Sequence, residues 1–346
     1  MCDSPIHAYL AKEPKFIYGN FMIVTKQYRE YAQLNKEYLF FNEKYLPRFH
    51  HWQSVWLPCG KCIQCLNKRS KSWEIRSIFE KNNYSDNCVL TLTYNDENLP
   101  VGADFIQTEN GLFKMPVDKK GVANYKDVQD FVKRIRKHFD FKKKIRYICS
   151  VEYGSSGTLR PHYHLVLFGF CPNDLKLYKK STKGTLLYKS ELMNKLWKKG
   201  FVDVGKCDIQ SCRYVSQYCC KGLLKRKQCM SLSDKFILDI KNRLSRECLH
   251  ASLGLGFETF KKVYSSIINA GKIVYGKFTY AIPRYFIKKL EFIDNELFKN
   301  VKNKGHTFWL NFVFDEETKR NAIARSEVLL HKLNLFHSDL IHCHSI

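Results

Sequence analysis

The chain has 346 residues, and its 58 lysine and arginine residues outnumber its 33 aspartate and glutamate residues, giving a formal net charge of +25. Chains this basic usually bind polyanions, most often nucleic acid or an anionic membrane surface. The charge disfavours an enzyme for small cations and leaves a basic surface kept for solubility as the alternative. Hydrophobic residues make up 45% of the chain and aromatic residues 14%, so it can bury a core and is not a disordered tail.

The sequence also indicates a compartment. No apolar run approaches the roughly 18 residues of a membrane span. The first residues lack the apolar stretch of a secretory signal. We therefore expect a cytoplasmic protein without a membrane partner, in which the fourteen cysteines are thiols and not disulfides.

The first half of the chain predicts two helices and one strand. Residues 1–57 are aromatic-rich without clear periodicity, so we expect an irregular N-terminal region. A basic helix is predicted at 66–81 and a β-branched strand at 88–94. Residues 124–139 repeat apolar side chains at spacings of three and four, as an amphipathic helix does. Between them lie four basic residues that we expect to contact DNA: Lys133, Arg134, Arg136 and Lys137.

The middle of the chain predicts a β-hairpin followed by a mixture of helices and strands. Strands at 145–153 and 162–170 flank a turn-rich segment. A helix at 190–199 with Ser190 as its N-cap, a strand at 201–205 and a helix at 211–224 follow. Helices and strands do not alternate strictly, which favours an α+β fold: a central antiparallel sheet with helices packed on one face.

The end of the chain is predicted to be mainly helical, with a turn into a helix at 282–290 and a helical extension over the last 40 residues. We divide the chain into an N-terminal region (1–57), a central domain that includes the basic helix (58–230) and a largely helical region (231–346). The last region is expected to pack on the core or to bind DNA.

The first candidate site is His162-Tyr163-His164 at the head of a predicted strand. Side chains alternate along a strand, so both imidazoles project from one face and could hold a divalent metal. In the predicted hairpin Glu152 ends the neighbouring strand and would supply a third, oxygen ligand. The ordinary alternative is two surface or core histidines and a carboxylate beside a turn.

The second candidate site is a pair of phenols, Tyr214 and Tyr218, on the predicted helix. Residues at i and i+4 lie on one helix face with their Cβ atoms about 5–6 Å apart. Lys221 lies near the same face and adds a cation. A tyrosine can act as a covalent nucleophile when the electrophile is activated, for example by a metal on a phosphodiester. The alternative is an aromatic helix face in the core.

The third candidate site is a cysteine motif. Cys59, Cys62 and Cys65 are spaced by three residues and could hold a structural Zn²⁺ with a fourth ligand such as His50 or His51. The alternative is a thiol-bearing loop before the basic helix.

Together these motifs resemble the HUH endonuclease superfamily, named for its histidine-hydrophobe-histidine strand. The sequence is most similar to replication initiators of the small single-stranded DNA phages of the microvirus family, in particular the gokushovirus branch. The similar segments run through most of residues 58–290: PCGKCIQC (58–65), LTLTYND (90–96), VEYG with TLRPHYHLVLFG (151–169), YVSQYCCK (214–221), and later LGLGFETF and IPRYF.

The resemblance implies roles for residues of the central domain. His162 and His164, with Glu152 as the third ligand, would bind Mg²⁺ or Mn²⁺. Tyr214 and Tyr218 would be the two nucleophiles. The basic residues expected beside them and along the DNA are Lys221, Arg160, Lys225, Arg226 and Lys227.

The activity implied is cleavage and rejoining of single-stranded or supercoiled phage DNA at the replication origin, through a 5′-phosphotyrosine link that frees a 3′-OH for rolling-circle synthesis. The sequence holds no phosphate-binding loop of the Gly-x-x-x-x-Gly-Lys-Ser/Thr type, so helicase and DNA polymerase would come from the host, in the bacterial cytoplasm. Two alternatives stay open: a non-catalytic protein that binds single-stranded nucleic acid, or a plasmid-type initiator, relaxase or transposase of the same superfamily.

Overall fold

The computed structural model describes the chain except for residues 1, 4, 12–22, 26–51, 61, 101–104, 109–110, 115–122, 154–160, 181–183, 229–248, 312–313 and 342–346. The chain forms two compact units. One comprises residues 1–66 and 287–331, and the other comprises residues 67–286 and 332–346. None of the helices in the described part of the chain is both long and apolar enough to cross a bilayer.

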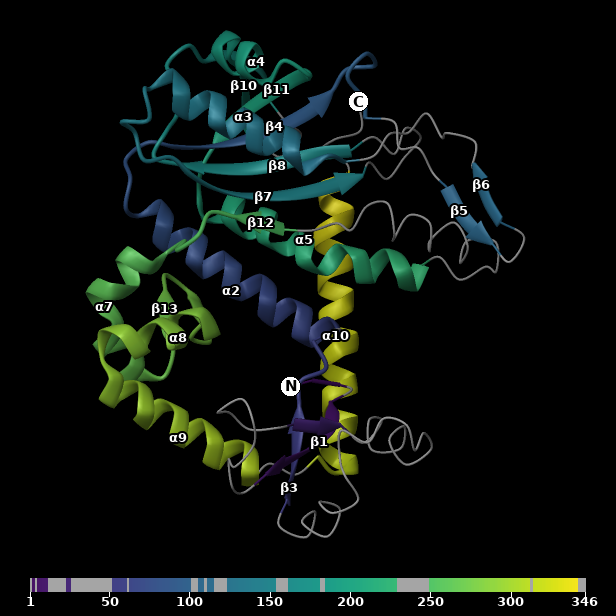
Figure 1. The fold of residues 1–346 in the computed structure, drawn as a ribbon, viewed down its shortest axis with the longest axis vertical. Coiled ribbons are helices and arrows are strands. Elements are labelled where there is room, and N and C mark those ends of the chain that lie inside the picture. Colours follow the sequence, from purple (N-terminus) through teal and green to yellow (C-terminus); the bar gives the residue numbers. More distant parts are fainter. Residues whose placement is uncertain are drawn as a thin grey trace. The chain divides into compact units, whose positions relative to one another are not determined.

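The larger unit is built on a seven-stranded sheet in which every neighbouring pair is antiparallel (Figure 1). In spatial order the strands are β12 (Leu249–Ala251), β7 (Arg146–Tyr153), β8 (Pro161–Phe168), β4 (Asn87–Tyr94), β11 (Gly200–Lys206), β10 (Leu186–Lys189) and β9 (Lys176–Lys180). This sheet and its helices confirm the predicted α+β class. The β7–β8 pairing confirms the predicted hairpin.

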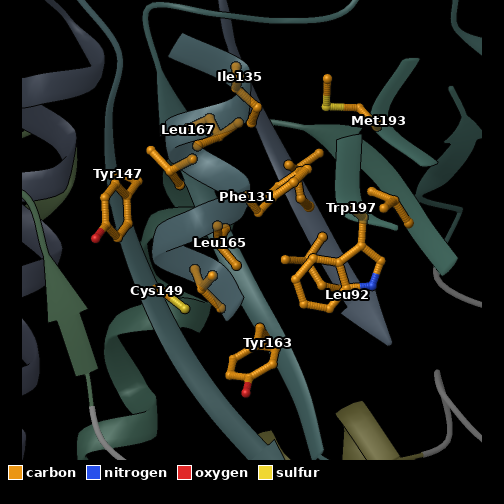
Figure 2. Packing of buried hydrophobic residues seen from close by; sticks show 14 of the residues in the cluster. Leu92, Phe131, Ile135, Tyr147, Cys149, Tyr163, Leu165, Leu167, Met193 and Trp197 are labelled. Atoms are coloured by element: carbon orange, nitrogen blue, oxygen red, sulfur yellow. The ribbon is translucent and has the colours of Figure 1, made fainter. Parts of the chain in front are cut away.

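One face of the sheet carries the hydrophobic core under α3 (Tyr125–His138) and α4 (Glu191–Trp197) (Figure 2). The apolar repeat of α3 is buried here as the sequence predicts, with Phe131 against Trp197 at 5.6 Å between ring centroids. Trp197 is fully buried, and its Nε1 donates to the Thr93 carbonyl at 3.1 Å. The predicted cap is also present, because the Ser190 hydroxyl accepts from the Met193 N–H.

The opposite face is covered by α5 (Ile209–Gln228), so the prediction that helices pack on one face only was wrong (Figure 1). The reason lies in β8. Tyr163 and Leu165 point into the core, and their neighbours His164 and Val166, on the other face, are also buried. A strand that is buried on both faces needs a layer on each side.

The helix α2 (Ile63–Lys81) is held within the larger unit by buried charges. Glu74 accepts a hydrogen bond from Arg213 Nε at 3.0 Å and another from the Tyr280 hydroxyl at 2.7 Å. Arg76 lies between the rings of Trp73 and Tyr285, at 4.1 and 3.9 Å from their centroids. Burial lowers the pKa of Arg76 to about 10, which leaves the guanidinium charged at neutral pH.

The other elements assigned to this part of the chain are shorter. They are β5 (Phe105–Thr108), β6 (Gly111–Lys114), α7 (Phe257–Ala270), β13 (Ile273–Tyr275), β14 (Phe278–Tyr280) and α8 (Arg284–Ile293). Two of the predicted helices are longer than expected. The one expected at 66–81 starts at Ile63, and the one expected at 211–224 covers Ile209–Gln228.

The smaller unit contains a three-stranded antiparallel sheet of β1 (Ile6–Ala11), β2 (Ile23–Thr25) and β3 (Trp52–Leu57) in the order β2-β1-β3. Its helical part includes α9 (Asn295–Asn311), which contacts β3, and most of α10 (Glu316–Ile341). The N-terminal region expected to be irregular therefore contains strands. They were missed because β1 and β3 are far apart in sequence and pair only through the tertiary fold.

Candidate active site

The strand register places the predicted metal ligands on one face of the sheet. In the β7–β8 ladder Glu152 is directly opposite His162, and Ser150 is opposite His164. On the other side of β8, Thr91 of β4 is opposite His164. Residues directly opposite in an antiparallel pair point to the same face. The two histidines therefore share the face covered by α5, as their spacing predicts.

His164 is held at both ring nitrogens. Its Nε2 lies 3.0 Å from Oε2 of Glu152, and its Nδ1 lies 3.3 Å from the Thr91 hydroxyl. The side chain is only 3% exposed, so few orientations are open to it. Thr91 is a functional candidate that the sequence analysis missed. Its place opposite His164 in the ladder becomes evident only once β4 and β8 are known to be neighbours.

The helix α5 brings both tyrosines onto His164. Their ring centroids each lie 5.2 Å from the imidazole centroid and 5.1 Å from one another. Tyr218 stacks on the imidazole with an interplanar angle of 27°, whereas Tyr214 meets it edge-on at 75°. The i, i+4 spacing therefore places the two phenols together, as predicted.

A chain of hydrogen bonds joins the phenols to the carboxylate. The Tyr218 hydroxyl bonds to a Glu152 oxygen and to the Tyr214 hydroxyl. A phenol has one proton and a carboxylate only accepts, so Tyr218 donates to Glu152 and Tyr214 provides the proton between the phenols. Tyr218 is 2% exposed, and this burial, with Tyr214 and Glu152 nearby, raises its pKa well above the usual value. Tyr214 is only half-buried.

Glu152 and His164 fit a divalent cation. Ligands about 2.1 Å from an octahedral metal are about 3.0 Å apart when adjacent, and Glu152 Oε2 and His164 Nε2 are 3.0 Å apart. His162 lies on the same face and is half-buried. Within the described residues, the group of three or more ligating side chains with donor atoms inside 4.8 Å is elsewhere, so His162 is not gathered with the other two in this way.

The predicted DNA contacts of α3 lie on the core side of the sheet, across from the tyrosines. Two of these side chains bind backbone carbonyls. Arg134 donates to Leu196 and Trp197 at the end of α4, and Arg136 donates twice to Ile145. Lys133 and Lys137 are exposed, and Lys133 lies 3.6 Å from Asp130. Of the four, only these two lysines are placed to contact a ligand from solvent.

The other predicted basic residues follow the tyrosines or precede the histidines. Arg160 lies outside the described residues. The remaining four lie in the last turns of α5, although their side chains are outside the described set: Lys221, Lys225, Arg226 and Lys227. The helix is longer than predicted and therefore continues through all four.

The cysteine motif forms a separate cluster that could bind a metal such as zinc. Cys59, Cys62 and Cys65 are joined by Cys2, and all four sulfur atoms lie within 4.8 Å of one another. The sequence analysis predicted a histidine as the fourth ligand, and His50 and His51 lie outside the described residues. Cys2 was missed because 57 residues separate it from Cys59.

The region that contains the active-site candidates matches a known family. Residues 87–223 match the family model of replication-associated proteins of the ORF2 type. The chain is 30% identical over 247 residues to replication-associated protein ORF2 of Spiroplasma virus 4, and this match covers 68% of each chain. The chain belongs to this family of microvirus-type phage replication-associated proteins. The resemblance read from the sequence is confirmed.

Two further replication-associated proteins show the same relationship. One is ORF4 of Chlamydia phage 1, 29% identical over 254 residues, which covers 69% of this chain and 55% of the relative. The other is VP4 of Bdellovibrio phage phiMH2K, 30% identical over 172 residues, which covers 48% of both. The matches thus span about half the length of these two relatives. No solved structure matches this replication-associated protein.

Proposed function

We propose that this protein nicks and rejoins single-stranded DNA at a phage replication origin by metal-dependent tyrosine transesterification. The observation that supports it best is the cluster on the α5 face of the sheet. Two phenols lie against His164, and Tyr218 donates to Glu152. Two nucleophiles beside a carboxylate and an imidazole suit phosphoryl transfer, which depends on positioning and on charge neutralisation.

Glu152 and His164 would hold Mg²⁺ or Mn²⁺, with His162 completing the ligand set after its side chain turns toward them. When bound, such a cation neutralises charge on the non-bridging oxygens of the scissile phosphate. Thr91 fixes His164 so that Nδ1 faces the hydroxyl and Nε2 faces the site. A ligand held by a second group in this way keeps its orientation and tautomer.

In the reaction, a tyrosine oxygen forms a bond to phosphorus while the bond from phosphorus to the 3′ oxygen breaks. The phenol loses its proton, and the Glu152 carboxylate is the acceptor within hydrogen-bond reach of Tyr218. The 3′ oxygen takes up a proton and becomes the free 3′-OH, while the 5′ end stays on the tyrosine. The second tyrosine would cleave the regenerated origin, and the 3′-OH would attack the first phosphotyrosine to close the strand. Bond energy is conserved, so joining needs no ATP.

The basic side chains would hold the DNA. Those proposed to lie along the strand are Arg160, Lys221, Lys225, Arg226 and Lys227, together with Lys133 and Lys137. The substrate would be single-stranded or supercoiled origin DNA in the bacterial cytoplasm, with host helicase and polymerase extending the 3′-OH. Binding through phosphates should weaken steeply as salt concentration rises.

The decisive experiment measures a covalent adduct. The full chain is incubated with single-stranded origin DNA and Mn²⁺, and protein–DNA complexes that resist denaturant are counted. We expect an adduct that chelator prevents and that the double variant Tyr214→Phe/Tyr218→Phe lacks. Tyr178→Phe, at a tyrosine that is 61% exposed, is the matched control. An adduct undiminished in the double variant would overturn the proposal.

The competing function is binding without chemistry, which the +25 charge alone would support. The paired phenols buried against Glu152 and His164 favour the enzyme, because a binding surface has no need of them. The variant His162→Ala/His164→Ala separates the two functions. A binding protein should keep its DNA affinity and has no nicking to lose, whereas the enzyme should bind DNA and no longer form the adduct. A plasmid-type initiator of the same superfamily would differ only in the origin that it cleaves.

A further inference from the structure

We propose that Cys2, Cys59, Cys62 and Cys65 bind one structural Zn²⁺ ion that fastens the N-terminal segment to the start of α2. The four sulfur atoms lie within 4.8 Å of one another, and Cys2 Sγ is 3.6 Å from Cys62 Sγ. Four sulfurs at about 2.3 Å from a tetrahedral zinc are about 3.8 Å apart. The cluster thus has nearly the dimensions of a zinc tetrathiolate.

The fold itself brings the fourth cysteine into place. The β1–β3 ladder begins with Ile6 opposite Leu57. Cys2 precedes this pair by four residues and Cys59 follows it by two. The paired strands therefore deliver both cysteines to the same end of the ladder. Asp3, the neighbour of Cys2, is held independently, because its Oδ2 accepts from the Ser326 hydroxyl of α10 at 2.7 Å.

Backbone groups around the sulfurs favour thiolates. The Cys59 N–H donates to Cys2 Sγ at 3.3 Å, and the Cys62 N–H donates to Cys59 Sγ at 3.2 Å. Cys62 immediately precedes α2 and Cys65 lies in its first turn, which has no acidic residue. A helix N-terminus stabilises negative charge. The thiolates of a zinc complex would supply that charge.

Zinc suits the cluster better than the other occupants of a four-cysteine site. An iron–sulfur cluster places several metal ions between its cysteines and needs wider spacing of the sulfur atoms than a single ion does. Two disulfides would hold the sulfur atoms of each pair at about 2.05 Å, and a bacterial cytoplasm disfavours them. A single tetrahedral ion contacts all four sulfurs at once.

The first test is metal content. The full chain, purified under reducing conditions and dialysed, is analysed for metals. We expect one zinc per chain, retained in Cys171→Ser, whose cysteine is half-buried elsewhere, and lost in Cys2→Ser and Cys62→Ser. The variant Glu152→Gln/His164→Ala should also keep its zinc. Loss of zinc from that variant would place the ion at the other site and overturn this proposal while leaving the nicking proposal standing.

A second measurement needs no variant to fold. Zinc is removed from the unmodified chain by chelator under reducing conditions, and Co²⁺ is added. One equivalent should produce the intense charge-transfer absorption of a tetrahedral cobalt thiolate, and Zn²⁺ should displace it. Absence of this absorption, iron in place of zinc in the purified chain, or intact Cys2–Cys62 disulfides with no metal uptake after reduction would each refute the zinc site. None of these outcomes bears on the tyrosine adduct.

Discussion

Glu152 Oε2 lies 3.0 Å from Nε2 of His164, although the residue directly opposite Glu152 in the β-ladder is His162. The carboxylate thus reaches diagonally to the next residue on the same face, a distance that a long side chain can span. It also accepts the Tyr218 hydrogen bond. Glu152 is therefore the group through which the strands and α5 meet.

The first prediction concerns the charge of Glu152. Glu152→Gln keeps the size of the side chain and removes the negative charge that a cation needs. We expect the Mn²⁺ concentration for half-maximal adduct formation to rise by at least about tenfold, in the range that ligand-shell changes produce. A titration of adduct yield against Mn²⁺ measures it. Glu258→Gln, at an exposed carboxylate in α7, should behave as the unmodified chain does. An unchanged Mn²⁺ requirement in Glu152→Gln would exclude the carboxylate as a ligand.

The second prediction concerns Thr91 as a positioning residue. Thr91→Val keeps the side-chain shape but removes the hydroxyl beside His164 Nδ1. Loss of such a partner typically weakens metal affinity about 10–100-fold. We expect the apparent metal affinity to fall within that range while saturating Mn²⁺ restores most of the adduct. Thr279→Val, at an exposed threonine of β14, is the control. Equal affinities in the two variants would show that Thr91 does not orient the imidazole.

The third prediction concerns the order of the tyrosines. Tyr214 is half-buried and Tyr218 is buried with its proton directed at Glu152, so a strand arriving from solvent meets Tyr214 first. In a single turnover we expect the nucleotide on Tyr214, and we expect Tyr214→Phe to slow the first adduct at least about tenfold. Tyr218→Phe should form the first adduct and fail in the second transfer. Peptide mapping that finds the first nucleotide on Tyr218 would reverse this order.

The fourth prediction concerns the buried pair between α2 and α5. Removing one partner of a buried ion pair typically costs about 3–5 kcal/mol because the other charge stays buried. We expect Arg213→Met to lower the free energy of unfolding in that range, since the Glu74 side chain is only 4% exposed. The double variant Glu74→Gln/Arg213→Met should regain part of the loss.

Urea denaturation measures both variants. Lys319→Met is the comparison, because it breaks a pair with Glu316 in which the side chains are 48% and 80% exposed. Exposed pairs contribute about 0–1 kcal/mol. A loss in Arg213→Met no larger than in Lys319→Met would mean that Glu74 is stabilised without its arginine.

Local periodicity was enough to predict much of the site. Alternation along a strand put His162 and His164 on one face, and the helical repeat put Tyr214 and Tyr218 together. The hairpin register then brought Glu152 opposite His162. These relationships span few residues and follow from backbone geometry alone.

Relationships between distant segments could not be predicted in this way. The pairing of β1 with β3, which delivers Cys2 to the other cysteines, depends on tertiary contacts. Periodicity likewise shows that Arg134 and Arg136 lie outside the apolar stripe of α3, but not that backbone carbonyls lie within their reach. A positive charge in a sequence does not reveal whether it serves the fold or a ligand.

Adjacent residues of β8 face opposite sides of the sheet, Tyr163 toward the core with Trp197 and His164 toward the tyrosines. One strand thus forms the floor of the site and the roof of the core. Local opening of the core would displace the site at the same moment, because the same backbone hydrogen bonds hold both. On heating, the loss of DNA cleavage should therefore coincide with the change in fluorescence of the buried Trp197, which makes that indole an optical reporter for a reaction on the far side of the sheet.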